Sequence, residues 1–315
     1  MNALDDTAFD VVVLDRTEAA EGVILLELGS VDRPLPRWRP GAHIDVILPD
    51  GDARQYSLCG SPGESTWRIG VLKEEDGRGG SAWIHATVQV GSVLRVAGPR
   101  NHFEFSPDKG TSYLFIAGGI GITAISSMLG VAEAAGVQYR LEYAGRSRSA
   151  MALTSLEQEH AGRVTIHAGD EGGRLDLDAL FADLPPFTTT FCCGPARLIE
   201  SVEAAAKGRQ LKVERFEPKI LGAPILAEPF EVELAFSGIE VTVPPERSIL
   251  EVVEEAGVLV LSSCKEGTCG TCETRVMAGV VDHRDSILTP LEQDANDVMY
   301  ICVSRSAGEK LTLEL

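Results

Sequence analysis

Short apolar and alternating runs, separated by turn-forming residues, fill the first hundred positions of the chain. β-Branched residues are frequent in these runs, and pairs such as Pro40–Gly41 and Pro62–Gly63 interrupt them. This spacing predicts a small antiparallel β-barrel with one short helix at Ser81–Thr87. The predicted strands are Phe9–Val13, Val23–Leu28, Ile44–Leu48, Arg54–Leu58, Trp67–Leu72 and Ser92–Val96.

The pattern changes near Thr111, where apolar strands begin to alternate with helical periods. Such alternation predicts a parallel sheet with helices on its faces. The predicted strands are Tyr113–Ala117, Tyr139–Tyr143, Val164–Ala168 and Thr188–Cys193, and the predicted helices are Thr123–Ala135, Ser155–His160 and Ala196–Lys207.

One uncharged stretch, Thr111–Ala132, is long enough on paper to span a bilayer. It contains Gly118, Gly119 and Gly121, with hydroxyl side chains among the residues that follow. Because glycines of this density mark a turn, we expect a strand, a tight turn and a helix here instead of a membrane span.

A stretch rich in Pro and Gly separates the last 86 residues from the rest. These residues open with two strand-like runs, Glu231–Phe236 and Ile239–Val243, followed by a helix that begins at Ser248 with a capping-box spacing to Glu251. A length of 315 residues also suits several domains. We therefore expect an antiparallel β-barrel over residues 1–108, an α/β parallel-sheet domain over 109–216, a linker over 217–229 and an α+β domain over 230–315.

Composition narrows the classes of function. Hydrophobic residues make up 44% of the chain and charged residues 24%, which is ordinary for a globular protein. The net charge of −19 argues against binding to nucleic acid or to an anionic membrane. Residues 230–315 carry 16 acidic and 6 basic side chains, a net −10, so we expect a basic docking face on a protein partner.

The N-terminal residues Met1–Asp10 are acidic and show no signal-peptide pattern. We therefore expect a cytoplasmic protein whose seven cysteines stay reduced, some of them as ligands.

Four of these cysteines form the strongest motif in the chain. Cys264, Cys269 and Cys272 stand at C-x4-C-x2-C, and Cys302 follows alone, which is the plant-type [2Fe–2S] spacing. Glycines between the ligands let a tight loop fold around the cluster. A structural zinc site also uses four cysteines, but zinc sites usually pair them in two short motifs. The alternatives left open are a zinc site and free thiols.

The stretch from Ser262 to Cys272, together with Tyr300–Ser304, resembles the ferredoxin domain of the phthalate dioxygenase reductase family. The resemblance implies a β-grasp fold for the C-terminal domain and a [2Fe–2S] cluster held by the four cysteines.

Two strings in the barrel are similar to the flavin-binding barrel of ferredoxin-reductase-like proteins. They are Arg54-Gln55-Tyr56-Ser57-Leu58 and the glycine cluster that ends in Gly79-Gly80-Ser81. Arg supplies a cationic fork for a phosphate, and glycines before a helix free backbone N–H groups for an anion. The resemblance implies a phosphate site at Arg54, Gly79, Gly80 and Ser81, and a flavin ring and ribityl chain along Tyr56, Ser57, Val71 and Lys73. It favours FMN over FAD.

The string Gly119-x-Gly121-x-x-Ala124, which includes Thr123, lies between a predicted strand and helix, as in dinucleotide-binding turns. Cys193-Gly194-Pro195 ends a later strand and opens a helix. The resemblance implies that Cys193 lies near the nicotinamide and that Phe216 covers the flavin ring, with Ser57 as the third residue at the reacting atoms. Cys59 and Cys192 are expected to be buried structural residues.

The choice of coenzyme is less clear from the sequence. Glu142 lies where a ribose-binding acid is expected, but strand alternation would turn it into the sheet. Arg146 and Arg148 could favour a 2′-phosphate. The resemblance favours NADH, with Arg146 at the adenosine part and Asp170 near the next strand end.

The domain order flavin, nicotinamide, ferredoxin is the order of the phthalate dioxygenase reductase family. The six histidines form no Cys-x-His pattern of a Rieske oxygenase. We therefore expect an NADH-dependent flavin and iron–sulfur oxidoreductase, a monomer that supplies electrons to a Rieske-type oxygenase of aromatic catabolism. Two alternatives stay open: an FAD-containing NAD(P)H reductase of a cytochrome or hybrid-cluster protein, and a non-redox scaffold with a structural zinc site.

Overall fold

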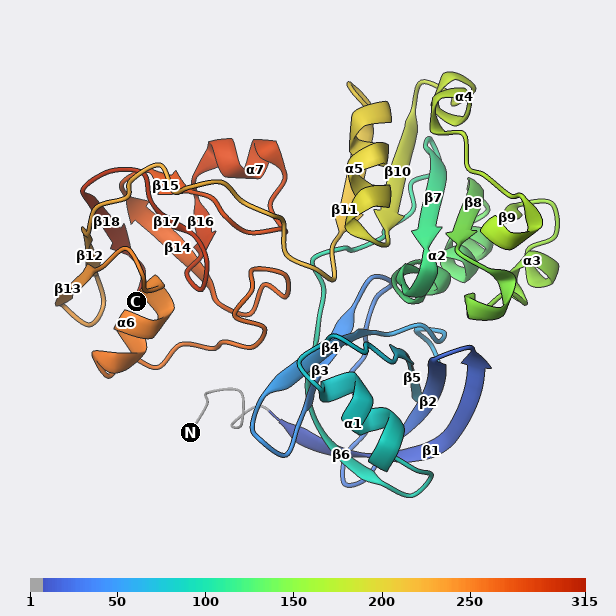
Figure 1. The fold of residues 1–315 in the computed structure, drawn as a ribbon, viewed down its shortest axis with the longest axis horizontal. Coiled ribbons are helices and arrows are strands. Elements are labelled where there is room, and N and C mark those ends of the chain that lie inside the picture. The colour runs from blue at the N-terminus through green and yellow to red at the C-terminus, as the bar shows by residue number, and fades with distance from the viewer. Residues whose placement is uncertain (1–7) are drawn as a thin grey trace. The chain divides into compact units, whose positions relative to one another are not determined.

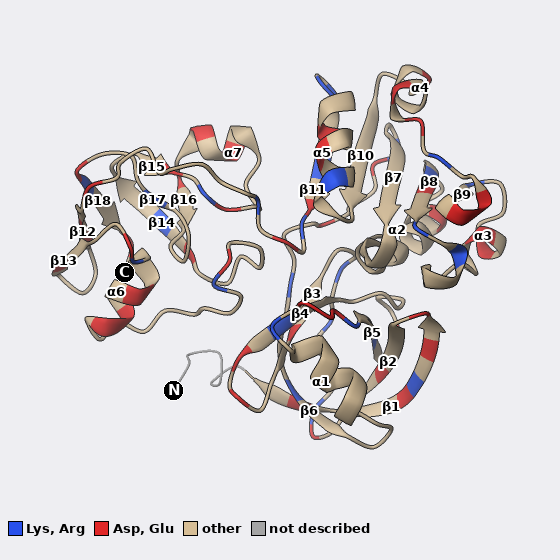
Figure 2. Ribbon diagram, viewed as in Figure 1, with Lys and Arg blue, Asp and Glu red and all other residues tan. Residues whose placement is uncertain are grey.

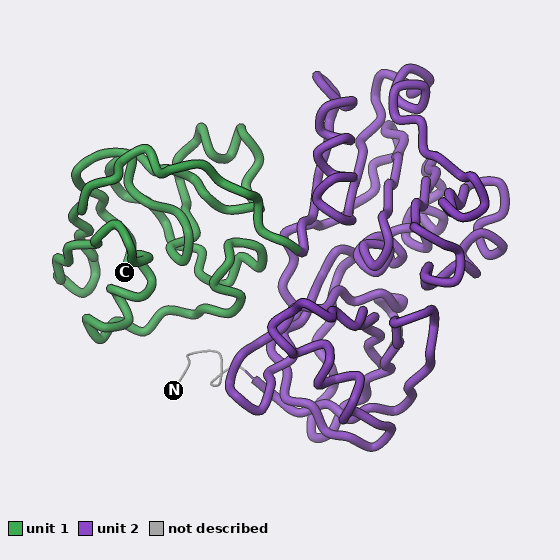
Figure 3. Tube along the Cα trace, viewed as in Figure 1, with its two compact units in different colours: residues 1–7, 217–315 green, residues 8–216 purple. Residues whose placement is uncertain are grey.

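The computed structural model describes residues 8–315, which divide into two compact units (Figure 3). One unit is Ala8–Phe216 and the other takes in Glu217–Leu315. The prediction about Met1–Asp10 therefore lies almost wholly outside the described residues.

The first part of the 8–216 unit is the predicted barrel (Figure 1). Its six strands pair antiparallel in the order β4-β3-β6-β1-β2-β5, and a bridge between Leu58 and Ile69 joins the two edges. Alternate residues such as Val11 and Val13 are buried, which is the period-2 pattern that the sequence shows. The elements are β1 (Phe9–Ala20), β2 (Val23–Ser30), β3 (His43–Ile47), β4 (Ala53–Ser57), β5 (Trp67–Leu72), α1 (Gly80–Thr87) and β6 (Val93–Arg100).

The second part of this unit is a parallel sheet in the order β11-β10-β7-β8-β9. Alternation along β7 sends Phe115 toward α2 on one face, and Leu114 and Ile116 toward α4 and α5 on the other. The sheet elements are β7 (Ser112–Gly118), β8 (Gln138–Gly145), β9 (Val164–Ala168), β10 (Thr188–Cys193) and β11 (Gln210–Glu214). The helices are η2 (Gly119–Gly121), α2 (Ile122–Ala135), η3 (Arg148–Ala150), α3 (Leu156–Glu159), η4 (Gly169–Glu171), α4 (Leu177–Ala182) and α5 (Ala196–Ala205).

The uncharged stretch Thr111–Ala132 is divided among strand β7, the 3₁₀ turn η2 and helix α2, as the sequence predicts. Within residues 8–315, no helix is both long and apolar enough to cross a membrane.

The 217–315 unit contains a mixed five-stranded sheet in the order β13-β12-β18-β14-β16, with β12 and β18 parallel. The predicted capping box at Ser248 and Glu251 is confirmed, and α6 packs Ile249 and Val253 into the core. The elements are β12 (Phe230–Leu234), β13 (Ile239–Val243), α6 (Ile249–Glu255), β14 (Glu273–Ala278), β15 (Val281–Asp282), α7 (Pro290–Ala295), β16 (Val298–Tyr300), β17 (Arg305–Ser306) and β18 (Lys310–Leu313). The expected fold classes are confirmed.

Candidate functional site

Arg54 and the N-terminus of α1 come together on the barrel. The Arg54 guanidinium donates to the Arg78 carbonyl at 3.2 Å, and a Cβ added at Gly80 would lie 2.8 Å from Arg54 Nε. Gly79, just before the helix, has φ of +85°, a backbone conformation that favours glycine. A fixed guanidinium beside free helical N–H groups is a donor set suited to one phosphate group.

Tyr56 and Ser57 follow Arg54 along β4. Burial raises the pKa of the Tyr56 hydroxyl, so this side chain stays neutral. Ser57 Oγ is buried and has no hydrogen-bond partner among the described residues. A buried hydroxyl without a partner is costly unless a ligand satisfies it, so Ser57 fits a polar edge of a bound flavin ring.

The other residues of the predicted flavin site differ in burial and in hydrogen bonding. Val71 is fully buried in the barrel core, so its side chain does not line a ligand site, and its carbonyl accepts a hydrogen bond from His85 at 2.9 Å. Ser81 Oγ accepts from the Glu74 amide at 3.0 Å. Lys73 is exposed and directly follows β5.

The glycine turn after β7 lies at the point where the strand order reverses, between β7 and β10. Gly119 has φ of +51°. A Cβ at Gly121 would lie 2.4 Å from the Cys193 carbonyl oxygen, and one at Gly194 would lie 2.9 Å from Gly118 Cα. Only glycines permit these two loops to touch, and a switch point of this kind is where open α/β sheets bind their ligands.

The barrel and the glycine turn are in direct contact. A Cβ at Gly70 of β5 would lie 2.7 Å from Thr123 Cγ2, and Ser126 of α2 donates to the Cys59 carbonyl at 3.3 Å. The two predicted cofactor sites are therefore neighbours within one unit, as a direct transfer between two bound cofactors requires.

Cys193 lies at the end of β10 and is fully buried, and its burial raises the pKa of its thiol. Phe216 is partly exposed two residues after β11. Cys59 and Cys192 are buried as expected, and burial raises the pKa of each thiol to about 12.

Glu214 is a candidate that the sequence did not indicate. It pairs with Cys193 across β10 and β11. One of its carboxylate oxygens is buried and has no hydrogen-bond partner in the described part of the chain, and burial raises its pKa to about 8. Such a carboxyl beside a predicted catalytic residue is a functional candidate. Strand β11 was not predicted, so the sequence offered no reason to place Glu214 there.

Glu142, in the middle of β8, is buried and contacts His167 of β9 at 2.7 Å. Asp170 accepts the Arg148 backbone N–H at 3.1 Å. The Arg148 guanidinium is held by Glu171 at 2.8 Å and by Glu157 at 3.4 Å. The Arg146 carbonyl oxygen lies 2.9 Å from where a Cβ of Gly169 would be, so the ends of β8 and β9 adjoin there.

In the other unit, the four motif cysteines are all buried. The pKa of Cys264 is lowered chiefly by hydrogen bonds from the thiols of Cys269 and Cys302, and Cys302 also contacts Cys272. The thiols thus form one connected group: Cys264 contacts Cys269 and Cys302, and Cys302 contacts Cys272. Two thiolates for each of two irons are what a [2Fe–2S] cluster needs.

The backbone around the cysteines turns tightly and directs amide groups at the sulfur atoms. Gly267 and Gly270 have φ of +70° and +75°. The Glu266 amide donates to Cys264 Sγ at 3.3 Å and the Cys264 amide to Cys269 Sγ at 3.4 Å. Hydrogen bonds to sulfur of this kind tune a cluster.

Across residues 8–315, no group of three or more His, Cys, Asp or Glu side chains meets the geometry of a single metal ion.

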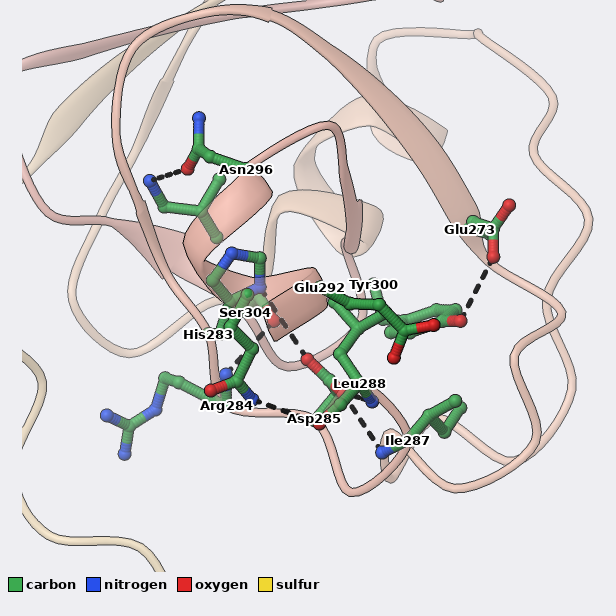
Figure 4. Close-up of polar contacts among 12 residues, drawn as sticks. Glu273, His283, Arg284, Asp285, Ile287, Leu288, Glu292, Asn296, Tyr300 and Ser304 are labelled. Carbon is green, nitrogen blue, oxygen red and sulfur yellow. Dashed lines mark hydrogen bonds and ion pairs between the residues drawn. The ribbon is translucent and has the colours of Figure 1, made fainter. Parts of the chain in front are cut away.

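A buried His–Asp pair near the cysteine loop is a second feature that the sequence did not indicate. His283 Nδ1 lies 3.8 Å from Asp285 Oδ1, and Asp285 Oδ2 accepts the amides of Ile287 and Leu288 at 3.0 and 2.7 Å (Figure 4). The amide of Ser286, which directly follows Asp285, donates to the Gly267 carbonyl at 2.9 Å. This segment therefore packs against the cysteine loop.

Comparisons with known proteins identify relatives along nearly the whole chain. The model of the 2Fe-2S iron-sulfur cluster binding domain matches residues 232–307. The chain is 42% identical to the phenoxybenzoate dioxygenase subunit beta of Ectopseudomonas oleovorans over 94% of each chain. It is 36% identical to the phthalate 4,5-dioxygenase oxygenase reductase subunit of Pseudomonas putida, over 99% of this chain and 98% of that one.

Two solved structures are similar along nearly the whole chain. Phthalate dioxygenase reductase, described as a modular structure for electron transfer from pyridine nucleotides to [2Fe-2S], matches with 33% identity and a TM-score of 0.70 over 100% of both chains. An intact type IV self-sufficient cytochrome P450 monooxygenase matches with 42% identity and a TM-score of 0.91. The match covers 98% of this chain, which spans 41% of that longer protein.

Proposed function

The chain belongs to the phthalate dioxygenase reductase family, and from that premise we propose that it takes electrons from NADH and passes them through FMN and a [2Fe–2S] cluster to a Rieske-type oxygenase. That it is an oxidoreductase delivering electrons to an oxygenase follows from the family. The finer parts of the proposal are the coenzyme, the flavin, the type of oxygenase and the residue roles.

One observation carries the redox assignment: four buried thiols form one connected group, and backbone amides of their loop donate to sulfur. When bound, the flavin supplies the conversion of a hydride into single electrons, and the cluster supplies a one-electron carrier. The chain's own residues bind, orient and shield these groups.

The residue roles in the proposal follow the contacts. Arg54, Gly79, Gly80 and Ser81 hold the flavin phosphate, and Tyr56, Ser57 and Lys73 line the flavin, with Val71 contributing backbone alone. Gly119, Gly121, Thr123, Gly194 and Pro195 form the nicotinamide coenzyme site. Cys193, Phe216 and Ser57 surround the reacting atoms. The domain boundaries follow the predicted ones, with the flavin domain over 1–108, the nicotinamide domain over 109–216 and the ferredoxin domain over 230–315.

FMN is favoured over FAD because the Arg54 cradle offers donors for one phosphate group. The test is to release the flavin from purified protein by heat and identify it by chromatography. FMN supports the proposal, and FAD contradicts this part. A colourless protein, or one that contains zinc without iron and sulfide, contradicts the redox assignment itself.

NADH is favoured over NADPH by the charges at the ends of β8 and β9. Glu171 and Glu157 both form ion pairs with the Arg148 guanidinium, and Asp170 adds a further negative charge. The 2′-phosphate of NADPH would therefore meet more repulsion than attraction here. Arg146 is left to contact the adenosine part. Steady-state reduction of an artificial acceptor should give a higher kcat/KM with NADH than with NADPH, and the reverse order would contradict this part.

A Rieske-type oxygenase is the partner that the similar reductase subunits suggest. The acidic ferredoxin unit also suits a basic docking surface, and Figure 2 shows α6 with acidic positions and no basic ones. Within this proposal the protein acts as a monomer in the cytoplasm and binds neither nucleic acid nor membrane. Light scattering of the purified protein tests the monomer.

A second candidate acceptor is a cytochrome P450, because the similarity to the self-sufficient P450 monooxygenase extends over 98% of this chain. Assays of NADH oxidation coupled to product formation with a Rieske oxygenase, and with a P450, distinguish the two. If product forms with the P450 and not with the Rieske oxygenase, the P450 replaces the Rieske oxygenase as the proposed partner.

A further inference from the structure

The stretch that the sequence predicts as a linker is bound along its length to the ferredoxin unit. We call residues 219–225 the strap and residues 282–286 the anchor. The Lys219 amide donates to Ser286 Oγ at 2.9 Å. Arg284 Nη2 donates to the Gly222 carbonyl at 2.7 Å, and the Ile225 amide donates to Asp282 Oδ2 at 3.0 Å.

These contacts run in opposite order along the two segments, so they fix the whole strap. Asp282 and Ser286 are buried, and Arg284 also pairs with Asp282 at 3.2 Å. Two of the three bonds involve a charged side chain, and charge-assisted hydrogen bonds are stronger than neutral ones. The side chains of Ile220, Leu221 and Ile225 are exposed, so the strap is held by its backbone.

The anchor has two faces because its residues alternate in direction. Asp282, Arg284 and Ser286 hold the strap. His283 and Asp285 turn inward, and Figure 4 shows the Arg284 guanidinium pointing away from Asp285. The Ser286 amide donates to the Gly267 carbonyl in the cysteine loop. The strap is therefore fastened to the segment that touches that loop.

The chain is also fixed on the other side of this stretch. Arg215 is buried in the 8–216 unit and pairs with Glu203 at 2.7 Å. Phe216, Glu217 and Pro218 lie between Arg215 and Lys219 and make no hydrogen bond or ion pair within the described structure, and proline restricts the backbone further. The free tether is therefore about three residues long, and not the thirteen that the linker prediction gives.

We propose that the strap is a positioning element for electron transfer from flavin to cluster, and that Asp282, Arg284 and Ser286 are its positioning residues. The inference rests on the proposed function. Each transfer moves one electron from the reduced flavin to one ferric ion of the cluster, and NADH supplies both electrons. The short tether keeps the cluster at high effective concentration relative to the flavin.

Hydrogen–deuterium exchange tests the strap without relying on activity. In the full-length protein, a peptide over 217–226 should exchange more slowly than an unstructured peptide of the same sequence. Ser286→Ala should speed exchange at the Lys219 amide, and Arg284→Gln with Ser286→Ala should speed it from Lys219 to Ala223, while the Ile225 amide stays bound to Asp282. Arg275→Gln is the control, because Arg275 is an exposed arginine of the same unit without a strap contact.

Stopped-flow kinetics tests the positioning role. Release of the strap as far as Ile225 lengthens the free tether from about three to about nine residues, so effective concentration and the flavin-to-cluster rate should fall about fivefold in the double variant. The rate of flavin reduction by NADH and the reduction potential of the cluster should match those of the wild type and of Arg275→Gln.

Three results would overturn the inference: rapid exchange of the strap in the wild type, release of the strap without a slower transfer, or an equal fall in Arg275→Gln. A changed cluster potential would also do so, because the slower rate would then come from driving force. Failure of the proposed function is distinct, since it would appear as missing flavin or iron while the exchange pattern of the strap remains.

Discussion

Glu214 brings a carboxyl with a perturbed pKa into the predicted nicotinamide site. Burial raises its pKa from 4.5 to about 8, so the folded protein holds this proton where the unfolded chain releases it. The stabilisation is complete below pH 4.5 and is lost as pH rises toward 8, because ionisation then costs desolvation.

We expect Glu214→Gln to remove this pH dependence. Relative to the wild type, the variant should gain stability between pH 5 and pH 8, by an amount on the order of a few kcal/mol at most, since the rest of the side chain is partly exposed. Calorimetry of the 8–216 unit in the full chain measures this. Glu200→Gln, an exposed carboxylate of α5, is the control. Parallel pH profiles for wild type and Glu214→Gln would contradict the assignment.

Arg54→Lys tests the phosphate cradle. Lysine keeps the charge but loses the planar fork, so we expect flavin affinity to fall roughly 10- to 100-fold, as for loss of a hydrogen bond to a charged group. Flavin fluorescence on dilution measures the dissociation constant. Arg95→Lys, a partly exposed arginine of the same barrel, should leave it unchanged. Equal affinity in Arg54→Lys and the wild type would place the phosphate elsewhere.

Residue patterns predicted the cluster ligands better than they predicted the buried polar residues around the sites. The spacing of Cys264, Cys269, Cys272 and Cys302 was enough to indicate a cluster, because ligand number and loop length restrict the chemistry. The buried pair His283–Asp285 and the carboxyl of Glu214 had no such signal, because a single titratable residue acquires its role only from tertiary packing.

At the scale of elements, the glycine turn after β7 makes a sharp prediction. A methyl group at residue 121 would meet the Cys193 carbonyl at 2.4 Å, so Gly121→Ala must separate the two loops. We expect the KM for NADH to rise about tenfold or more, which corresponds to about 1.4 kcal/mol. The rate of reduction against NADH concentration measures it.

Gly130→Ala is the matched control, because nothing lies within 4 Å of the added methyl group in α2. It should leave KM unchanged and stabilise the helix by about 0.5–1 kcal/mol. A similar KM in the two variants would show that the contact between the loops does not shape the coenzyme site.

Elements with strong periodicity were predicted, and most of the short ones were not. The six barrel strands and β7–β10 alternate clearly or form apolar runs, and α6 carried its capping box. Strands β14–β18 escaped prediction because several have two to four residues and follow a loop shaped by its ligands. The Pro and Gly content of 217–229 predicts irregular backbone, but composition does not show which side chains bind that backbone.

At the scale of the molecule, charge is distributed unevenly between the two units. Residues 230–315 carry a net −10, and the whole chain −19. Attraction between this acidic unit and a basic partner is screened by salt, with a Debye length of about 10 Å at 0.1 M.

We therefore expect the second-order rate of electron transfer to the oxygenase to fall several-fold between about 0.05 and 0.5 M NaCl. Flavin reduction by NADH in the same samples is the internal reference. Transfer to the oxygenase that is unaffected by salt would contradict a docking surface governed by charge.

The contact of Gly70 with Thr123 has a consequence for how solvent friction enters the catalytic cycle. Because the barrel and the glycine turn belong to one packed unit, hydride transfer requires no large piece of protein to move through water. Solvent viscosity should therefore leave that step almost unchanged. Any step in which the ferredoxin unit must diffuse, either toward its partner or on its three-residue tether, slows in proportion to viscosity. The rate of hydride transfer therefore depends on packing within one unit, whereas the rates of the later steps depend on solvent viscosity.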